Sequence, residues 1–178
     1  MARPPQHVLL LRAVNVGGTG KLPMADLRRM LEALGCTDVR TYIQSGNVVL
    51  RAPARLAARL CRALPDAIEA EHGHRPPVLL RDEKALRAVV ANNPFPEIED
   101  PKRLHVAFLG EAPAPDRAID PNRSPGDRFV LRGRELYLHL PAGVGQTKLD
   151  NAYLERALGT TSTVRNWRTV GKLLELLG

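Results

Sequence analysis

A glycine-rich loop near the N-terminus contains residues that could hold an anion. It lies within Leu11–Pro23 (LRAVNVGGTGKLP), follows an apolar run, and includes Gly17, Gly18 and Lys21. Glycine permits positive φ angles and a close approach of a ligand to the backbone. The loop also leads into a predicted helix, whose first N–H groups and dipole favour an anion. A ligand site and a simple turn are both compatible with this pattern, and three glycines with a lysine exceed what a turn requires.

Neither of the two common nucleotide-binding motifs matches this loop. The phosphate-binding pattern G-x-x-x-x-G-K-[ST], aligned on Gly20-Lys21, places Asn15 at the first glycine and Leu22 at the hydroxyl that binds Mg²⁺. The dinucleotide pattern G-x-G-x-x-G fails because Pro23 occupies the position of its third glycine. The sequence therefore predicts an anion-binding loop without a nucleotide motif.

A second loop of similar composition occurs in the second half of the chain. Within Pro141–Asn151 (PAGVGQTKLDN), Gly143 and Gly145 precede Lys148. No consensus motif matches, and a flexible connection would also explain the glycines. The recurrence of a glycine- and lysine-bearing loop favours a functional role.

Two further segments carry polar side chains that could face a ligand. In the predicted hairpin YIQSGNVV, we expect Gln44 and Asn47 to share one side, although Ser, Gly and Asn here are also ordinary turn residues. At the predicted start of the C-terminal helix, Arg165 and Asn166 precede Trp167, which we expect in the core. A cation in the first turn opposes the helix dipole, so Arg165 would need an anion or an acidic partner nearby.

Together these segments predict one polar ligand site. Arginine and lysine would hold an anionic group, glycine N–H groups would donate hydrogen bonds, and asparagine and glutamine would orient the ligand. Its members are Arg12, Asn15, Gly17, Gly18, Lys21, Gln44, Asn47, Lys148, Arg165 and Asn166. We predict no metal ligands and no cofactor. If chemistry occurs, Lys21 or Lys148 would stabilise charge.

The histidines form no recognisable catalytic motif, and no general base is evident. His72 and His74 stand at a polar helix end, where we expect them to be solvent-exposed. His105 and His139 lie in predicted strands, where lone histidines are usually structural. The catalytic residues, and the question of enzymatic activity, therefore stay open.

The elements that must position the first loop follow a β-α-β-β-α-β order, which is typical of a ferredoxin-like unit. Helix Arg55–Glu71 contains Pro65, which could kink or split it. The other elements predicted in this half are strand His7–Val14, helix Met24–Gly35, hairpin Val39–Ala52 and strand Pro76–Asp82.

The second half repeats these ingredients less regularly, so we predict a degenerate duplication. Its predicted elements are helix Glu83–Ala91, strand Arg103–Gly110, hairpin Arg128–Leu140, helix Ala152–Leu158 and helix Thr163–Leu177. The predicted class is α+β, with two degenerate ferredoxin-like halves, residues 1–82 and 83–178, packed as one compact unit without a flexible linker. The ligand site would then form in a polar cleft between the halves.

Composition narrows the classes of partner. The net charge of +7 suggests a polyanion, yet 21 of the 26 basic residues are arginine, as a GC-rich genome would also produce. Cys36 and Cys61 fit no metal spacing and are expected to be reduced thiols. The sequence shows no membrane span and no signal peptide, so we expect a cytoplasmic protein without a membrane partner.

The residues above resemble the bacterial domain of unknown function 1697 family over nearly the whole chain. The similar segments are LLRAVNVGGTGKLPMADLRRMLEALG, DVRTYIQSGNVVL, NPFP, GVGQTKLDNAYLERALG and TVRNWRTVGKLLEL. Where the family typically has Arg-Gly-Ile-Asn, this chain has Ala13 and Val14 between Arg12 and Asn15, and Thr147 replaces a common serine. The resemblance implies a two-half α+β fold with ferredoxin-like subdomains and no particular activity.

Three functional hypotheses remain at this point. The leading one is a small protein that binds an anionic ligand. The alternatives are a nucleic-acid-binding protein that uses a basic surface and a protein interaction module. No sequence motif supports the nucleic-acid alternative. The oligomeric state stays open.

Overall fold

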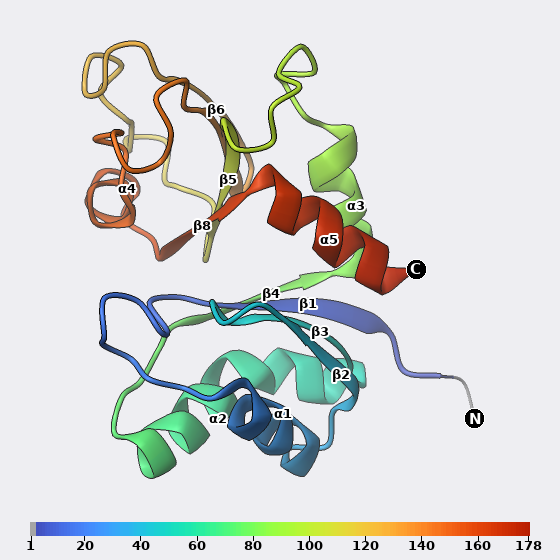
Figure 1. Cartoon of the computed structure of the whole chain (residues 1–178). Coiled ribbons are helices and arrows are strands. Elements are labelled where there is room, and N and C mark those ends of the chain that lie inside the picture. The colour runs from blue at the N-terminus through green and yellow to red at the C-terminus, as the bar shows by residue number, and fades with distance from the viewer. Residues whose placement is uncertain (1–2) are drawn as a thin grey trace. The chain divides into compact units, whose positions relative to one another are not determined.

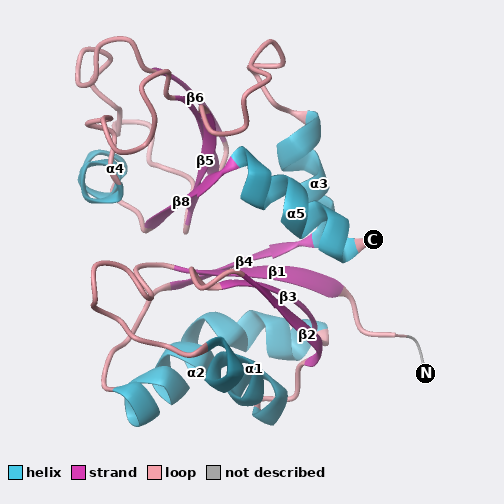
Figure 2. Ribbon diagram, in the orientation of Figure 1, coloured by secondary structure: helices cyan, strands magenta, loops and turns pink. Residues whose placement is uncertain are grey.

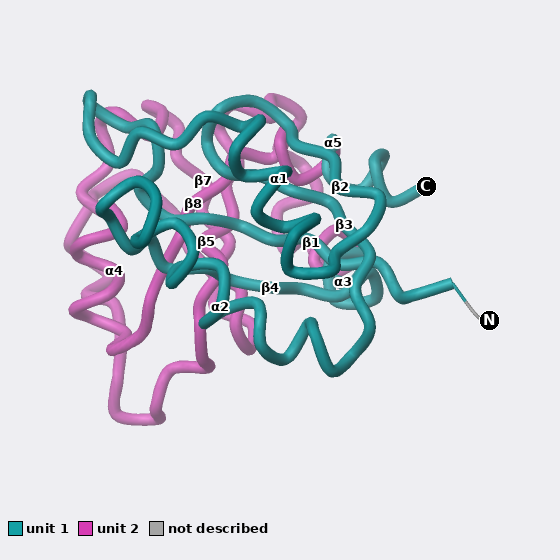
Figure 3. The backbone as a smooth tube through the Cα atoms, turned by 90° about the horizontal axis from the view of Figure 1, so that it is seen from below, with its two compact units in different colours: residues 1–88, 172–178 teal, residues 89–171 magenta. Residues whose placement is uncertain are grey.

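The computed structural model describes residues 3–178, which form two four-stranded antiparallel sheets with helices. Residues 1–88 with 172–178 make up one compact unit (unit 1), and residues 89–171 make up a second (unit 2; Figure 3). The α+β class and its two halves, each with a sheet and helices, are therefore confirmed. The sequence-based boundary after Asp82 falls at the start of a helix, and the division between the units falls inside that helix.

Unit 1 contains its elements in the predicted order β-α-β-β-α-β (Figure 1). They are β1 (Gln6–Leu11), α1 (Met24–Ala33), β2 (Thr37–Tyr42), β3 (Asn47–Arg51), α2 (Ala54–His72) and β4 (Val78–Asp82). The strands are ordered β2-β3-β1-β4, and each neighbouring pair is antiparallel. Helices α1 and α2 cover one face of this sheet (Figure 2).

The core of unit 1 forms where the strand and helix periodicities meet. Alternate residues of β1 and β3 pack against the helices, as Leu9, Leu11 and Leu50 do. Helix α2 contributes buried leucines at i, i+4 spacing, and its Pro65 is buried inside one continuous helix of 19 residues. The possible split of this helix at Pro65 therefore does not occur.

Unit 2 follows the same strand plan, with one complete helix where unit 1 has two. Its elements are β5 (Leu104–Leu109), β6 (Arg128–Arg132), β7 (Glu135–His139), α4 (Asn151–Leu158) and β8 (Ser162–Asn166). Helices α3 (Glu83–Ala91) and α5 (Trp167–Leu177) are each divided between the two units. The strand order is β6-β7-β5-β8, again antiparallel throughout. Between β5 and β6, where unit 1 has α1, residues 110–127 form turns and loop. The ferredoxin-like designation of the two halves stays a prediction.

The predicted C-terminal helix Thr163–Leu177 was wrong in its first turn. Residues Ser162–Asn166 form β8, which pairs with β5 so that Val164 lies opposite Ala107. Helix α5 begins at Trp167. Its cap is Asn166, whose Oδ1 accepts a hydrogen bond from Thr169 N at 2.8 Å.

Candidate functional site

The first glycine loop connects β1 to α1 through an unusual run of left-handed backbone. Five of its residues have φ between 54° and 79°, and two of these, Ala13 and Asn15, are not glycine. At Gly20 a Cβ would lie 2.5 Å from Ala13 O, so glycine is required there. At Gly17 and Gly18 nothing lies within 4 Å of a Cβ position, so this part of the loop opens to solvent.

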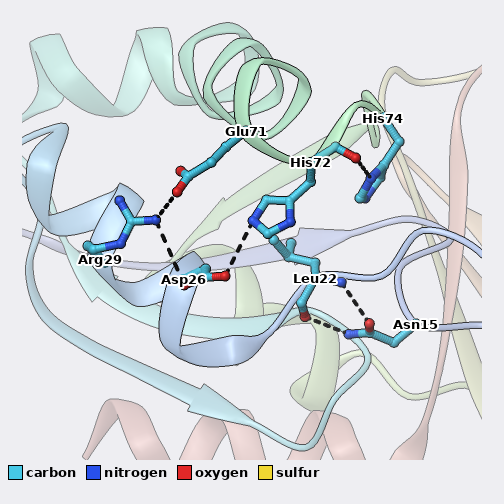
Figure 4. Close-up of polar contacts among 7 residues, drawn as sticks. All are labelled: Asn15, Leu22, Asp26, Arg29, Glu71, His72 and His74. Carbon is cyan, nitrogen blue, oxygen red and sulfur yellow. Dashed lines mark hydrogen bonds and ion pairs between the residues drawn. The ribbon is translucent and has the colours of Figure 1, made fainter.

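Asn15 holds the loop in shape. Its Nδ2 donates to Leu22 O at 2.9 Å, and its Oδ1 accepts from Leu22 N at 2.9 Å (Figure 4). The same Nδ2 also donates to Gln44 O at 2.7 Å. Its backbone N–H donates to Gly20 O at 2.9 Å. The side chain thus closes the loop and fastens it to the β2–β3 turn. Asn15, a predicted ligand contact, therefore has a positioning role.

The turn between β2 and β3 packs tightly against the loop. Leu11 N donates to Gly46 O at 2.9 Å, and a Cβ on Gly46 would lie 2.7 Å from Leu11 Cβ. Asn47 is fully buried, and its Nδ2 donates to Ser45 Oγ at 2.8 Å and Tyr42 O at 3.2 Å. Asn47, also a predicted ligand contact, therefore stabilises the turn.

The accessible polar groups of this region are a smaller set than the sequence predicted. Gly17, Gly18, Lys21 and Gln44 are exposed, whereas Arg12 is half-buried and donates its backbone N–H to Pro77 O at 3.0 Å. Within residues 3–178, no ion pair involves Lys21. Unit 1 thus brings together a glycine tip, a lysine and an amide on one exposed loop pair.

Sequence reasoning missed a polar cluster beside the start of α1. His72 Nε2, at the end of α2, lies 3.4 Å from Asp26 Oδ2 in the first turn of α1. Arg29 pairs with Asp26 at 3.8 Å and also with Glu71 (Figure 4). The sequence carried one usable signal, because α1 and α2 of a β-α-β-β-α-β unit run antiparallel, which brings the first turn of one helix to the last turn of the other.

The prediction that His72 and His74 are solvent-exposed was wrong. Both are half-buried, and the Nε2 atom of each is buried. His74 Nδ1 lies 3.3 Å from His72 O. Because a carbonyl oxygen only accepts, this His74 nitrogen is the donor, and the proton is therefore on Nδ1.

The second glycine loop is held by a hydroxyl–carboxylate network within unit 2. Asp127 Oδ2 accepts hydrogen bonds of 2.6 Å from Ser124 Oγ and from Thr147 Oγ1. The backbone N–H of Lys148 donates to Ser124 Oγ at 3.1 Å, and the residue is exposed. The hydroxyl at Thr147 therefore serves the loop itself. Ser124 and Asp127 carried no sequence signal, since they lie in the proline-rich segment before β6.

Arg165 and Asn166 lie in a strand and at a helix cap. Arg165 is 9% exposed, and its Nη1 donates to Thr163 Oγ1 at 2.6 Å and to Val164 O at 3.0 Å. Burial lowers the pKa of this guanidinium to about 10. Since Arg165 lies in β8, the predicted conflict with a helix dipole does not exist. The hydrogen bonds of Lys148 go to Arg123 and Ser124, so they do not join it to these residues.

The surface of unit 1 has depressions away from the first glycine loop. Three surface depressions of unit 1, of about 530, 630 and 470 Å³, are lined by residues outside the first glycine loop. Nowhere in residues 3–178 do three His, Cys, Asp or Glu side chains gather in a way that could hold a metal ion. None of the helices in this range is long and apolar enough to cross a membrane.

Comparisons with known proteins identify a family and a similar structure, but neither has a named activity. A family model described as "Protein of unknown function (DUF1697)" matches residues 5–137. The structure of conserved bacterial protein SP0830 from Streptococcus pneumoniae is similar with a TM-score of 0.73. That similarity covers 98% of this chain and 99% of that one at 21% identity, so it speaks to the fold alone. No curated protein matches the chain.

Proposed function

Since the chain belongs to the DUF1697 family of proteins of unknown function, we propose its function from the site: the protein binds a small anionic ligand at the first glycine loop. Lys21 supplies the positive charge, and the backbone N–H groups of Gly17 and Gly18 donate hydrogen bonds to the anion. Gln44, on the turn that Asn15 fastens to the loop, orients the ligand. A cytoplasmic location belongs to the same proposal.

The observation that carries this proposal is the contrast between a fixed loop base and an open tip. Asn15 closes the base with three side-chain hydrogen bonds. In the part of the chain that the structure describes, no hydrogen bond uses the N–H groups of Gly17 and Gly18. A loop that is already ordered loses little conformational entropy on binding, and preorganisation of this kind favours affinity.

Backbone strain supports the same proposal. Ala13 and Asn15 have φ of 58° and 54°, a region that residues with a side chain adopt at some energetic cost. Strain of about 1–3 kcal/mol per residue persists where the surrounding structure enforces it, and such residues cluster at ligand sites. A simple connection from β1 to α1 would not need two strained residues before its glycines.

The proposal rests on unit 1 alone. Lys148, Arg165 and Asn166 of unit 2 were predicted in the same site, in a cleft between the halves, and that cleft stays a prediction. Asp26 lies in the first turn of the helix that follows Lys21, and His72, at the end of α2, lies 3.4 Å from it, so this pair belongs to the same unit as the proposed site. The proposal concerns binding alone and assigns no reaction to the ligand.

Thermal-shift screening with inorganic phosphate, phosphorylated metabolites and nucleotides tests the proposal. A ligand that binds only the folded state at 100 times its Kd raises the unfolding free energy by about 2.7 kcal/mol. We expect Lys21→Met to weaken the response at least tenfold in ligand concentration, because the single cation of the exposed tip is removed.

The matched control is Lys102→Met. Lys102 is also exposed, and within residues 3–178 its only hydrogen bond is from its backbone N–H to Asp100. The substitution therefore removes the same charge at a distant position in sequence. Equal responses of the two variants, or no response of the natural protein to any anion, would contradict the proposal.

A further inference from the structure

Helix α2 carries three arginines on one stripe of its surface. Arg55, Arg59 and Arg62 follow i, i+4, i+7 spacing, and all three are exposed. Residues at this spacing share one helix face, and at 1.5 Å per residue the three positions span about 10 Å along the axis. We call these three residues the arginine stripe.

The arginine stripe has no acidic partner in the part of the chain that the structure describes. Across residues 3–178, no ion pair joins any of its members to a carboxylate. Other arginines of unit 1 are neutralised, as Arg51 is by Asp38 at 3.0 Å and Arg75 by Glu69 at 3.0 Å. A general enrichment in arginine would place unpaired cations without regard to position, whereas here three lie on adjacent turns of one face.

The charge arrangement of α2 is unfavourable for the helix itself. Its first turn contains Arg55 and no acidic residue, and its cap residue Pro53 makes no side-chain capping bond. The acidic residues Asp66, Glu69 and Glu71 lie toward its C-terminal end. Cations near the N-terminus and anions near the C-terminus oppose the helix dipole. The stripe is therefore not explained by helix stability.

We propose that the arginine stripe binds the phosphate backbone of double-stranded nucleic acid. The guanidinium group matches phosphate with two parallel hydrogen bonds, and a row of cations along one helix face can meet a row of phosphates. Arg59 and Arg62 also line the depression of about 530 Å³, together with Asp66, Cys61 and two alanines. This surface is separate from the first glycine loop, so it does not depend on the ligand proposed there.

The chemistry of α2 disfavours two other polyanions. Base stacking on single strands requires exposed aromatic side chains, and α2 contains no Phe, Tyr or Trp. Insertion into a lipid surface requires large exposed apolar residues beside the cations. Those that residues 3–178 expose are Val16, Ile43, Leu131 and Val144, none of which is in α2. Contact with the backbone of a duplex needs neither.

Binding of a fluorescent 20-base-pair duplex at several salt concentrations tests the proposal. Each neutralised phosphate contributes about −0.9 to the slope of log K against log salt, so three contacts contribute about −2.7. We expect the variant R55Q/R59Q/R62Q to lose this share of the slope and to bind at least tenfold more weakly at low salt. Its melting temperature should be unchanged or higher, since Arg55 no longer opposes the dipole.

The control is R40Q/R156Q/R168Q, which removes the same net charge. These three arginines are exposed, lie on β2, α4 and α5, and form no ion pair within residues 3–178. The control variant should retain the duplex affinity. An equal loss in both variants would overturn the proposal, as would no binding at low salt, tighter binding of single strands, or binding of anionic vesicles in preference to the duplex.

Cys61 gives a second readout on the natural protein. It is exposed and lines the same depression as Arg59 and Arg62, whereas Cys36 is buried and its burial raises the pKa of the thiol to about 11. A maleimide should therefore label Cys61 selectively. The duplex should slow this labelling at low salt and cease to do so in R55Q/R59Q/R62Q, and labelling that the duplex leaves unchanged would count against binding at α2.

Discussion

At the residue scale, Gly17 and Gly20 share a backbone conformation but differ in their surroundings. Their φ angles are 57° and 60°, and both lie in the first glycine loop. A Cβ at position 17 would meet nothing within 4 Å, whereas a Cβ at position 20 would lie 2.5 Å from Ala13 O. The two glycines therefore separate the effect of backbone conformation from the effect of close packing.

Alanine substitutions at these two positions should consequently differ in their effect on stability. We expect Gly17→Ala to lower the unfolding free energy by about 1 kcal/mol, the ordinary cost of a left-handed side-chain-bearing residue. Gly20→Ala should cost at least about 2 kcal/mol, because the loop must also move away from Ala13 O. Urea unfolding of both variants measures the difference, and equal losses would show that the loop is not closed as described.

At the element scale, β8 and α5 show how one residue divides a strand from a helix. Asn166 is the last residue of β8 and also the cap of α5. Its Oδ1 accepts a hydrogen bond from the N–H group of Thr169 in the first turn of that helix. The sequence predicts one helix through this point because the apolar residues from Val164 onward fit a helical stripe. The β-branched residues Thr163 and Val164 favour a strand. The pairing with β5 decides that residues 162–166 form a strand and not the first turn of the helix.

Removal of this cap should weaken the junction. We expect Asn166→Ala to lower the unfolding free energy by about 1 kcal/mol, since one N–H of the first turn loses its acceptor, and Asn166→Asp to retain most of it. Thermal or urea unfolding checks this. An alanine variant as stable as the natural protein would place the start of α5 elsewhere.

Much of the fold could be predicted from the sequence, because strong periodicity marks α1, α2 and the central strands. The site was predicted less well. Asn15, Asn47 and Arg165 have residue types that suit a ligand, yet their side chains bond to the protein itself. Asp26 and His72 are far apart in the sequence, and only the packing of α1 on α2 brings them together. Residue type predicts chemistry, whereas tertiary contacts decide whether the side chain is available for it.

At the scale of the whole molecule, buried histidine links stability to pH. Burial in β5 lowers the pKa of His105 below its ordinary value of 6.5, so the unfolded chain binds this proton more readily than the folded one. The contribution is therefore fully present above pH 6.5 and is lost as the pH falls through the folded-state pKa. Asp38 and Glu97, whose pKa values arginines hold below the ordinary range, act at lower pH.

The unfolding free energy should accordingly fall between pH 7 and pH 5, and His105→Gln should flatten this part of the curve. Urea unfolding at closely spaced pH values measures the slope, which reports the difference in bound protons between the unfolded and folded states. His139 also has a lowered pKa, mainly through burial, so part of the slope should persist in the variant. An unchanged slope in His105→Gln would contradict the assignment.

The central claim is that an anion binds at the first glycine loop, and backbone amide NMR tests it most directly. Addition of inorganic phosphate, or of the best anion from the screen, should shift the amide signals of Gly17, Gly18 and Lys21. The signals of Gly17 and Gly18 should stay in place in Lys21→Met at the same anion concentration, and all three signals should shift normally in Lys102→Met. Signals of these residues that remain unchanged in the natural protein, while others shift, would place any anion site elsewhere and contradict the claim.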